Sequence, residues 1–199
     1  MAQDRLTLAR LIGSRLCHDL ISPIGAIANG MELVALSGAP QSPELELINA
    51  SVAGATARIR FYRIALGMSS GEQRLGASEL RRILDDYYRD TRLRCTWELI
   101  EDAPRNEVQA AFLALLCLGT ALPLGGTMQV QHSAQAGWTV QASGQLRLEP
   151  ALWEMLNGAK PPEDLEPAQV QFAMLPECTS ALHRQLHHHK SEDQLTISF

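Results

Sequence analysis

Apolar residues recur every three or four positions along the first part of the chain. The row comprises Ile12, Leu16, Leu20, Ile24, Ile27, Met31 and Val34. At about 100° per residue these positions fall on one side of a helix, so the pattern predicts a long amphipathic helix. The stretch Ser37–Pro40 contains a glycine and a proline and is expected to end this helix.

A second helix is predicted to begin at Ser42-Pro43-Glu44. The serine supplies an N-cap hydroxyl, the proline suits the first turn, and the early acid suits a helix N-terminus. Another apolar row follows, comprising Ile48, Val52, Ala55, Ile59, Tyr62 and Leu66. The two helices form a predicted hairpin, which a short flexible stretch at Gly67–Gly71 separates from the remaining sequence.

Two helices of about 25 residues cannot bury both apolar rows against each other alone. Pairing two hairpins in a symmetric homodimer would bury them in a four-helix bundle. The alternative is that both helices pack on the C-terminal part of the same chain. We predict the homodimer.

Helical and strand patterns alternate beyond residue 75. Helices are predicted at 78–90 with Ser78 as N-cap, from Pro104 to about Ala121, at 150–157 and at 167–188. Strands are predicted at 93–99, 127–132, 138–142 and 195–199, with the second and third joined as a hairpin. The expected fold class is α+β, with a helical hairpin at 1–68 and an α/β sandwich at 75–199, its helices on one face of a sheet.

Composition excludes several classes of protein. The chain has 199 residues with 17 Lys+Arg against 22 Asp+Glu, and this negative balance argues against a general nucleic-acid binder. No run of apolar residues is long enough for a transmembrane helix, and the N-terminus lacks the unbroken apolar stretch of a signal peptide, so no membrane partner is expected. The cysteines Cys17, Cys95, Cys117 and Cys178 form no C-x-x-C, which favours a reducing, cytoplasmic location.

One histidine lies on the polar side of the first predicted helix. His18 is about 180° from the centre of the apolar row, on the side that also carries Ser22 and Gly25. A glycine within a helix costs about 1 kcal/mol relative to alanine, and it lets another molecule approach closely. Pro23 removes a backbone hydrogen bond from the same helix. An exposed histidine is most often an ordinary surface residue, but these two helix-weakening neighbours favour a functional site.

The segment around His18 resembles the phospho-acceptor helix of two-component histidine kinases. The matching positions are His18, Asp19, Leu20, Ser22, Pro23, Ile24, Ile27, Glu32 and Leu33. The nucleotide-binding boxes of such a kinase are absent further along. The predicted helix at 111–121 has no Asn to hold magnesium, and Ser143–Arg147 replaces a D-x-G-x-G motif.

An acceptor helix without nucleotide boxes resembles the ChpT-type histidine phosphotransferases, and the layout is similar to the sporulation phosphotransferase of bacilli. The resemblance implies a homodimer with a central four-helix bundle and a degenerate ATPase-like domain. Such a protein passes phosphoryl groups between receiver-domain aspartates of response regulators, without ATP. It implies that His18 is the phospho-acceptor, that this chain binds no cofactor or metal, and that the partner receiver brings Mg²⁺.

Several residues near His18 are candidates for supporting roles. Asp19 matches the kinase acid, and it either acts directly or pairs with Arg15. The candidate receiver-docking residues are Arg15, Ser22, Gly25, Arg58 and Arg63. Arginines attract an acidic partner over long range, although a solvated helix face is the alternative for them. A neutral imidazole is a ready nucleophile near pH 7, and phosphoryl transfer depends mainly on positioning and charge neutralisation.

Competing interpretations are less well supported. His187-His188-His189 with His183 resembles a metal site, but no acid or cysteine completes it, so the exposed end of a helix is preferred. Trp97, Trp138 and Trp153 are assigned to packing. An ATP-using kinase with a divergent site is disfavoured by the missing boxes. A non-catalytic receiver-binding module is disfavoured by the spacing of Ser22 and Pro23 after His18.

Overall fold

The computed structural model describes residues 2–36, 42–68, 72–133 and 135–199, and among these all side chains except those of 2–12 and 14–19. The chain divides into two compact units, Met1–Met68 and Ser69–Phe199. The described part of the first unit is helical, and the second unit combines helices with a sheet. None of the described helices is long and apolar enough to cross a membrane.

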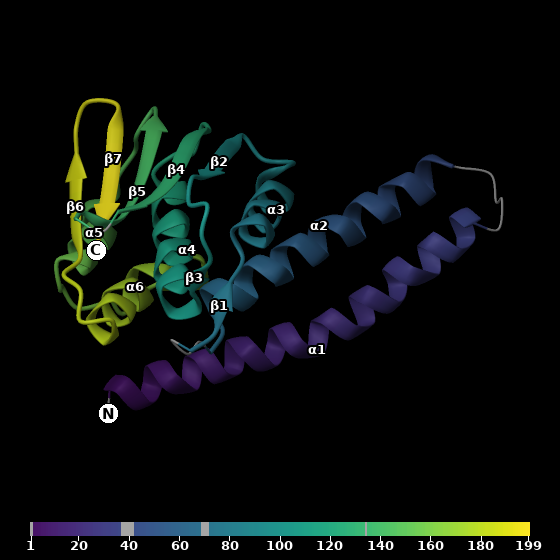
Figure 1. Cartoon of the computed structure of the whole chain (residues 1–199), viewed down its shortest axis with the longest axis horizontal. Helices are drawn as coiled ribbons and strands as arrows, with labels where there is room; N and C mark the ends of the chain where they lie inside the picture. Colours follow the sequence, from purple (N-terminus) through teal and green to yellow (C-terminus); the bar gives the residue numbers. More distant parts are fainter. Residues whose placement is uncertain (1, 37–41, 69–71, 134) are drawn as a thin grey trace. The chain divides into compact units, whose positions relative to one another are not determined.

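Two antiparallel helices, α1 (Ala2–Leu36) and α2 (Pro43–Ala65), lie side by side in the first unit (Figure 1). Helix α1 contains Pro23 and continues through it. The predicted start of α2 is confirmed, because Ser42 is the N-cap and its Oγ accepts a hydrogen bond from the Leu45 backbone N–H at 3.3 Å. Helix α1 ends at Leu36. The stretch Ser37–Pro40, which was expected to end this helix, lies outside the described residues.

The residues that α2 buries in the single chain differ from its longest apolar row. The buried side chains are Ala57, Phe61, Ile64 and Ala65. The predicted row, from Ile48 to Leu66, is half-buried or exposed. Helix α2 therefore carries apolar residues on more than one side toward its C-terminal end, and the burial of the predicted row in a homodimer stays a prediction.

Five strands form a mixed sheet in the order β2-β4-β5-β7-β6. They are β2 (Leu93–Trp97), β4 (Gly126–Ser133), β5 (Gly137–Gly144), β7 (Gln194–Ser198) and β6 (His187–Lys190). Strand β2 is parallel to β4 and the other pairs are antiparallel, including the predicted β4–β5 hairpin, which sets Val130 opposite Val140. A separate pair, β1 (Arg74–Leu75) with β3 (Ala103–Pro104), was not predicted, since two-residue strands show no alternation.

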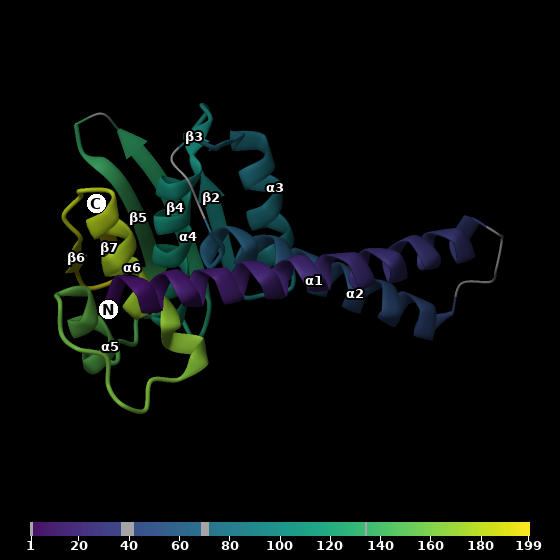
Figure 2. The same cartoon turned by 90° about the horizontal axis from the view of Figure 1, so that it is seen from below.

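Helices cover one face of this sheet (Figure 2). They are α3 (Ala77–Tyr88), α4 (Arg105–Thr120), α5 (Pro150–Leu156) and α6 (Val170–Ala181), with a 3-10 turn, η1 (Pro167–Gln169), before α6. Helix α4 contacts the sheet on one side and α6 on the other, which is why nearly every residue from Val108 to Leu118 is buried. The described fold is therefore the expected mixture of helices and a sheet, with its core around α4.

The two faces of the sheet differ in chemistry. The covered face carries buried apolar side chains, among them Trp97, Val130, Trp138, Val140 and Ile197. The open face carries polar residues at the alternate positions, and one row across it comprises Thr96, Gln129, Gln141, Thr196 and His189. Because successive side chains of a strand point to opposite faces, the alternation of apolar and polar residues gives the sheet one core face and one hydrated face.

Two predicted helix boundaries are wrong. Helix α3 has Gly76 as its N-cap, not Ser78, and the Leu80 N–H donates to the Gly76 carbonyl oxygen at 3.0 Å. The helix predicted at 167–188 ends at Ala181, because the chain turns at His183 with φ of 55°. The histidines at 187–189 therefore lie on the edge strand β6 and not at a helix end.

Candidate functional site

Position 18 lies near the middle of α1, where the helical repeat puts it on one row with Ser22, Gly25, Asn29 and Glu32. Ser22, Asn29 and Glu32 are exposed and Gly25 is half-buried. A Cβ added to Gly25 would meet no atom within 4 Å, so there is open space about two turns beyond position 18. The side chains of Arg15, His18 and Asp19 lie outside the described side chains.

The register of the hairpin follows from the close approach of Gly13 to Leu66. A Cβ at Gly13 would lie 3.1 Å from the Leu66 carbonyl oxygen. In an antiparallel pair, moving five residues along α1 corresponds to moving about five residues back along α2. Position 18 is therefore level with Phe61, and Arg58 and Arg63 lie within about one turn of that level.

The arginines of α2 do not all share one side of the helix. Arg58, Arg60 and Arg63 are exposed. The helical repeat puts Arg60 and Arg63 about 60° apart, whereas Arg58 is about 140° from Arg63. A partner that docks on one side of α2 would meet Arg63 with Arg60, or Arg58 alone. The two predicted docking arginines, Arg58 and Arg63, are thus not brought together.

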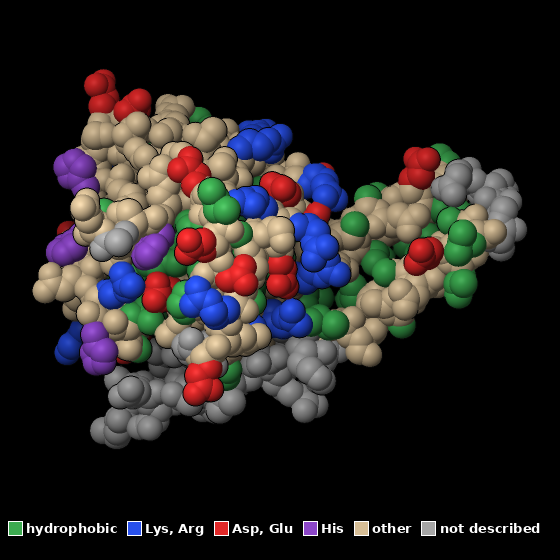
Figure 3. Space-filling model, viewed as in Figure 1, with side chains coloured by type: hydrophobic (Ala, Val, Ile, Leu, Met, Phe, Trp, Pro, Cys, Tyr) green, Lys and Arg blue, Asp and Glu red, His purple; other side chains and the backbone are tan. Residues whose placement is uncertain are grey.

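Apolar residues remain exposed on the side of α1 opposite the row of position 18. Leu20, Ile27 and Val34 are spaced by seven residues and are 49%, 47% and 38% exposed. Half-buried Ile24, Ala28 and Met31 form another row about 70° away around the helix. Leu47 and Ile48 of α2 are also exposed. Figure 3 shows several hydrophobic side chains on the surface of the hairpin.

Other reactive side chains are unsuited to nucleophilic chemistry. Burial, with a smaller contribution from Asp85, raises the pKa of the Cys95 thiol to about 12. Burial raises the pKa of Cys117 well above its ordinary value. Thiols with raised pKa values stay protonated and are poor nucleophiles. Among the described residues no three His, Cys, Asp or Glu side chains are placed to hold a metal ion.

The stretches in which a kinase would carry its nucleotide boxes line an open cavity of about 590 Å³ in the second unit. Thr120 lies at the end of α4, Arg147 and Glu149 follow β5, and Glu166 precedes η1. The named lining has one arginine against two carboxylates and includes no asparagine. It therefore lacks both the asparagine with which such a kinase would hold magnesium and the positive charge that a triphosphate requires.

A family model, a related sequence and a solved structure that match this chain are all described as phosphotransferases. The family model described as "Histidine phosphotransferase C-terminal domain" matches residues 77–194. Protein phosphotransferase ChpT of Brucella abortus (strain 2308) is 35% identical over 173 residues, which are 83% of this chain and 82% of that protein. A solved structure described as "1.7 Angstrom Structure of a Bacterial Phosphotransferase" has a TM-score of 0.69 and 28% identity, and the match covers 98% of this chain and 95% of that chain.

Proposed function

Because this chain belongs to the histidine phosphotransferase family, we propose that His18 carries the phosphoryl group that it transfers. The chain is a phosphotransferase of a phosphorelay. In our proposal the group passes from the aspartate of one receiver domain, through His18, to the aspartate of another. The observation that carries this assignment is the row that position 18 shares, on which Ser22, Asn29 and Glu32 are exposed and Gly25 borders open space.

The transfer uses a neutral imidazole. A ring nitrogen of His18 attacks the phosphorus of the acyl phosphate on the donor receiver. The N–P bond forms as the P–O bond to the aspartate breaks, which leaves a carboxylate on the donor. The same steps in reverse load the second receiver. Exposed Ser22 and small Gly25 let a receiver approach α1, and a Mg²⁺ ion held by the receiver would offset the phosphoryl charge.

A second copy of the chain covers the exposed apolar row of α1 in this proposal. Leu20, Ile27 and Val34 have the seven-residue spacing of a bundle seam, and burying such a row stabilises helix association. The row of position 18 is on the opposite side of α1. A four-helix bundle built on the seam therefore leaves both copies of His18 open to receivers.

The phosphoryl group comes from a receiver and not from ATP in this proposal. The cavity between Thr120 and Arg147 supports this, because its acidic lining is unfavourable for a triphosphate. Asp19 and Arg15 adjoin His18 in the sequence and remain candidates for positioning it. Arg63 with Arg60, or Arg58, would attract the acidic receiver.

Transfer from a radiolabelled phospho-receiver, without ATP, tests the function. Wild type is expected to become labelled and to pass the label to an unlabelled receiver. His18→Ala should lose at least 99% of the label, on the order of the loss when a nucleophile is removed. Asn29→Ala, on the same row but three turns away, is the matched control and should transfer normally. Equal labelling of His18→Ala would refute the assignment.

A further inference from the structure

Strand β6 carries three consecutive histidines that have no role in the proposed transfer. The strand, His187–Lys190, lies at the edge of the sheet next to β7 (Figure 1). Periodicity placed these histidines on a helix, where adjacent side chains point apart. On a strand, residues two positions apart share a face. The strand conformation therefore changes which of the three rings can act together.

The middle histidine fixes which side chains share a face. His188 lies opposite buried Ile197 of β7, and its ring lies against Trp153 of α5 with centroids 5.5 Å apart. His188 is therefore on the covered face of the sheet. Because successive side chains of a strand point to opposite faces, His187 and His189 both lie on the open face, and both are exposed.

Pairing with β7 holds the two exposed imidazoles in place. His187 lies opposite Ser198, and His189 lies opposite Thr196. All 4 residues of β6 have a partner on β7. Side chains on a paired strand are positioned more precisely than side chains on a loop.

The spacing of the two rings fits two ligands of one metal ion. Residues two positions apart on a strand are about 6.7 Å apart along its axis. Two nitrogens bound to one tetrahedral zinc ion, each at about 2.0–2.1 Å, are about 3.3 Å from each other. Each ring therefore has to lean toward the other by only about 1.7 Å, a shift that rotation of the side chain can supply.

The strand residues beside the two rings are uncharged. On the open face they are Thr196 and Ser198 of β7, followed by Thr139 and Gln141 of β5. Lys190 follows the alternation to the other face. Among the described residues no third His, Cys, Asp or Glu completes a cluster. The two rings thus leave two positions of a four-coordinate ion to water or to another molecule.

We propose that His187 and His189 form a chelating site for a divalent late first-row transition metal such as zinc. Imidazole nitrogens are good ligands for Zn²⁺, Ni²⁺ and Cu²⁺, whereas Mg²⁺ prefers oxygen ligands. The resemblance to ChpT-type proteins implied that this chain binds no metal, so the site is an addition to that expectation. It lies in the second unit and does not depend on the assignment of His18.

Nitrogen-15 nuclear magnetic resonance of the histidine rings tests the site in the full chain, with zinc chloride as the probe. The ring signals of His187 and His189 should shift together and saturate at a single zinc ion per chain. The ring of His188, on the other face, should shift less. Magnesium chloride should shift none of the three rings, because that ion prefers oxygen ligands.

His189→Gln should weaken zinc binding by about tenfold or more, since even the loss of a group that orients a ligand costs that much. His132→Gln removes an exposed histidine elsewhere in the second unit, and as the matched control it should bind zinc like wild type. The backbone amide spectrum reports whether each variant is folded.

A gain of affinity tests the shared face directly. Thr196→His adds an imidazole opposite His189 on the open face and should tighten zinc binding by about tenfold or more. Unchanged zinc affinity in His189→Gln, equal shifts of all three rings of β6, or no gain from Thr196→His would overturn the proposal.

Discussion

The backbone of α1 meets the backbone of α2 where Gly13 approaches Leu66. A Cβ at position 13 would lie 3.1 Å from the Leu66 carbonyl oxygen. This approach is closer than most side chains permit, so the absence of a side chain at Gly13 sets the separation and register of the hairpin. Through that register, position 18 comes level with the arginine-bearing part of α2.

Gly13→Val is expected to force the two helices apart. The branched side chain should lower the free energy of unfolding by about 1–3 kcal/mol, as overpacking does in other cores. Gly13→Ala is the control, because a gain in helix propensity of about 1 kcal/mol offsets a contact that is only slightly tight. Thermal unfolding followed by the helical circular dichroism signal measures both. A valine variant as stable as the alanine variant would contradict the register.

Ile27→Glu is expected to convert a dimer into a monomer. Ile27 is the central residue of the exposed apolar row, and a charge there would lie in the seam of the proposed bundle. Asn29→Glu places the same charge on the opposite side of α1 and should leave the dimer intact. Light scattering coupled to size exclusion measures the mass of each. A monomeric wild type, or a dimeric Ile27→Glu, would contradict the bundle.

The sequence predicted the elements whose formation depends on local patterns. Ser42 caps α2 as expected, and the β4–β5 hairpin follows its alternating apolar positions. The histidine run at 187–189 was placed on a helix, and it lies on strand β6 because pairing with β7 decides its conformation. Two-residue β1 and β3 also depend on a distant partner, so no local pattern indicates them.

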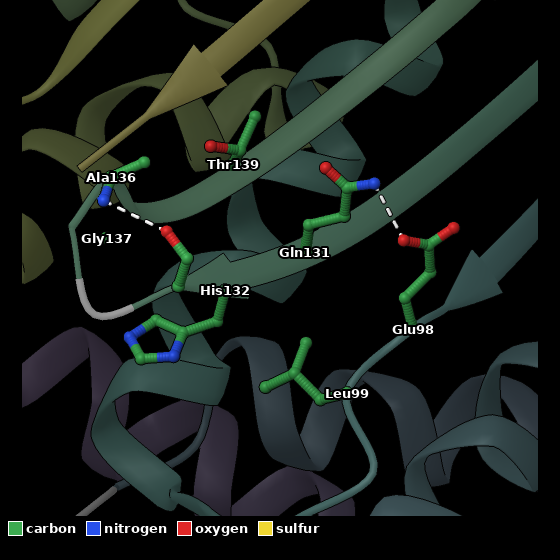
Figure 4. A pocket seen from close by; sticks show the side chains of 8 residues that line it. Glu98, Leu99, Gln131, His132, Ala136, Gly137 and Thr139 are labelled. Atoms are coloured by element: carbon green, nitrogen blue, oxygen red, sulfur yellow. Dashed lines mark hydrogen bonds between the residues drawn. The ribbon is translucent and has the colours of Figure 1, made fainter.

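The sequence predicted that His18, Ser22 and Gly25 share one side of a helix. It did not predict how residues of different helices and strands come together. The spacing of Ser22 and Gly25 relative to His18 is a property of one helix, which sequence periodicity describes well. The same helical repeat, applied to α2, puts Arg58 and Arg63 about 140° apart, so these two arginines do not share a side of the helix. A pocket of about 350 Å³ lined by Glu98, Gln131 and Thr139 (Figure 4) was not predicted, because its residues come together only through the pairing of β4 with both β2 and β5.

Glu107→Ala is expected to destabilise the second unit. The Trp138 indole N–H donates to Glu107 Oε2 at 2.5 Å, and Trp138 is only 1% exposed. Losing the acceptor leaves a buried donor unpaired, which costs about 1–3 kcal/mol of unfolding free energy. Arg184→Ala removes a partly exposed ion pair with the same carboxylate and should cost at most about 1 kcal/mol.

Urea unfolding followed by tryptophan fluorescence measures both changes. Glu107→Gln keeps an acceptor for the indole and should recover much of the lost stability. A Glu107→Ala variant as stable as wild type, or a larger loss for Arg184→Ala, would refute the importance of this hydrogen bond.

Acidification is expected to destabilise the fold through His188. Burial lowers the pKa of His188, and Glu154 opposes this with a smaller effect. The ring lies against Trp153, with centroids 5.5 Å apart. Because the folded-state pKa is the lower one, the unfolded chain binds more protons below about pH 6.5, and stability falls as the pH falls.

His188→Gln should therefore flatten the dependence of unfolding free energy on pH between about pH 7.5 and about pH 5.5. His187→Gln changes an exposed neighbour on the same strand and serves as the control. The comparison uses urea unfolding at the two pH values. A wild-type slope in His188→Gln would exclude this histidine as the cause.

The most direct test of the account is to locate the phosphoryl group on the chain. Wild type is loaded from a phospho-receiver, digested, and analysed by mass spectrometry together with acid and base treatment. We expect one phosphorylated peptide, containing His18, whose modification is lost in acid and kept in base. A phosphoryl group on another residue, or a modification stable to acid, would contradict it.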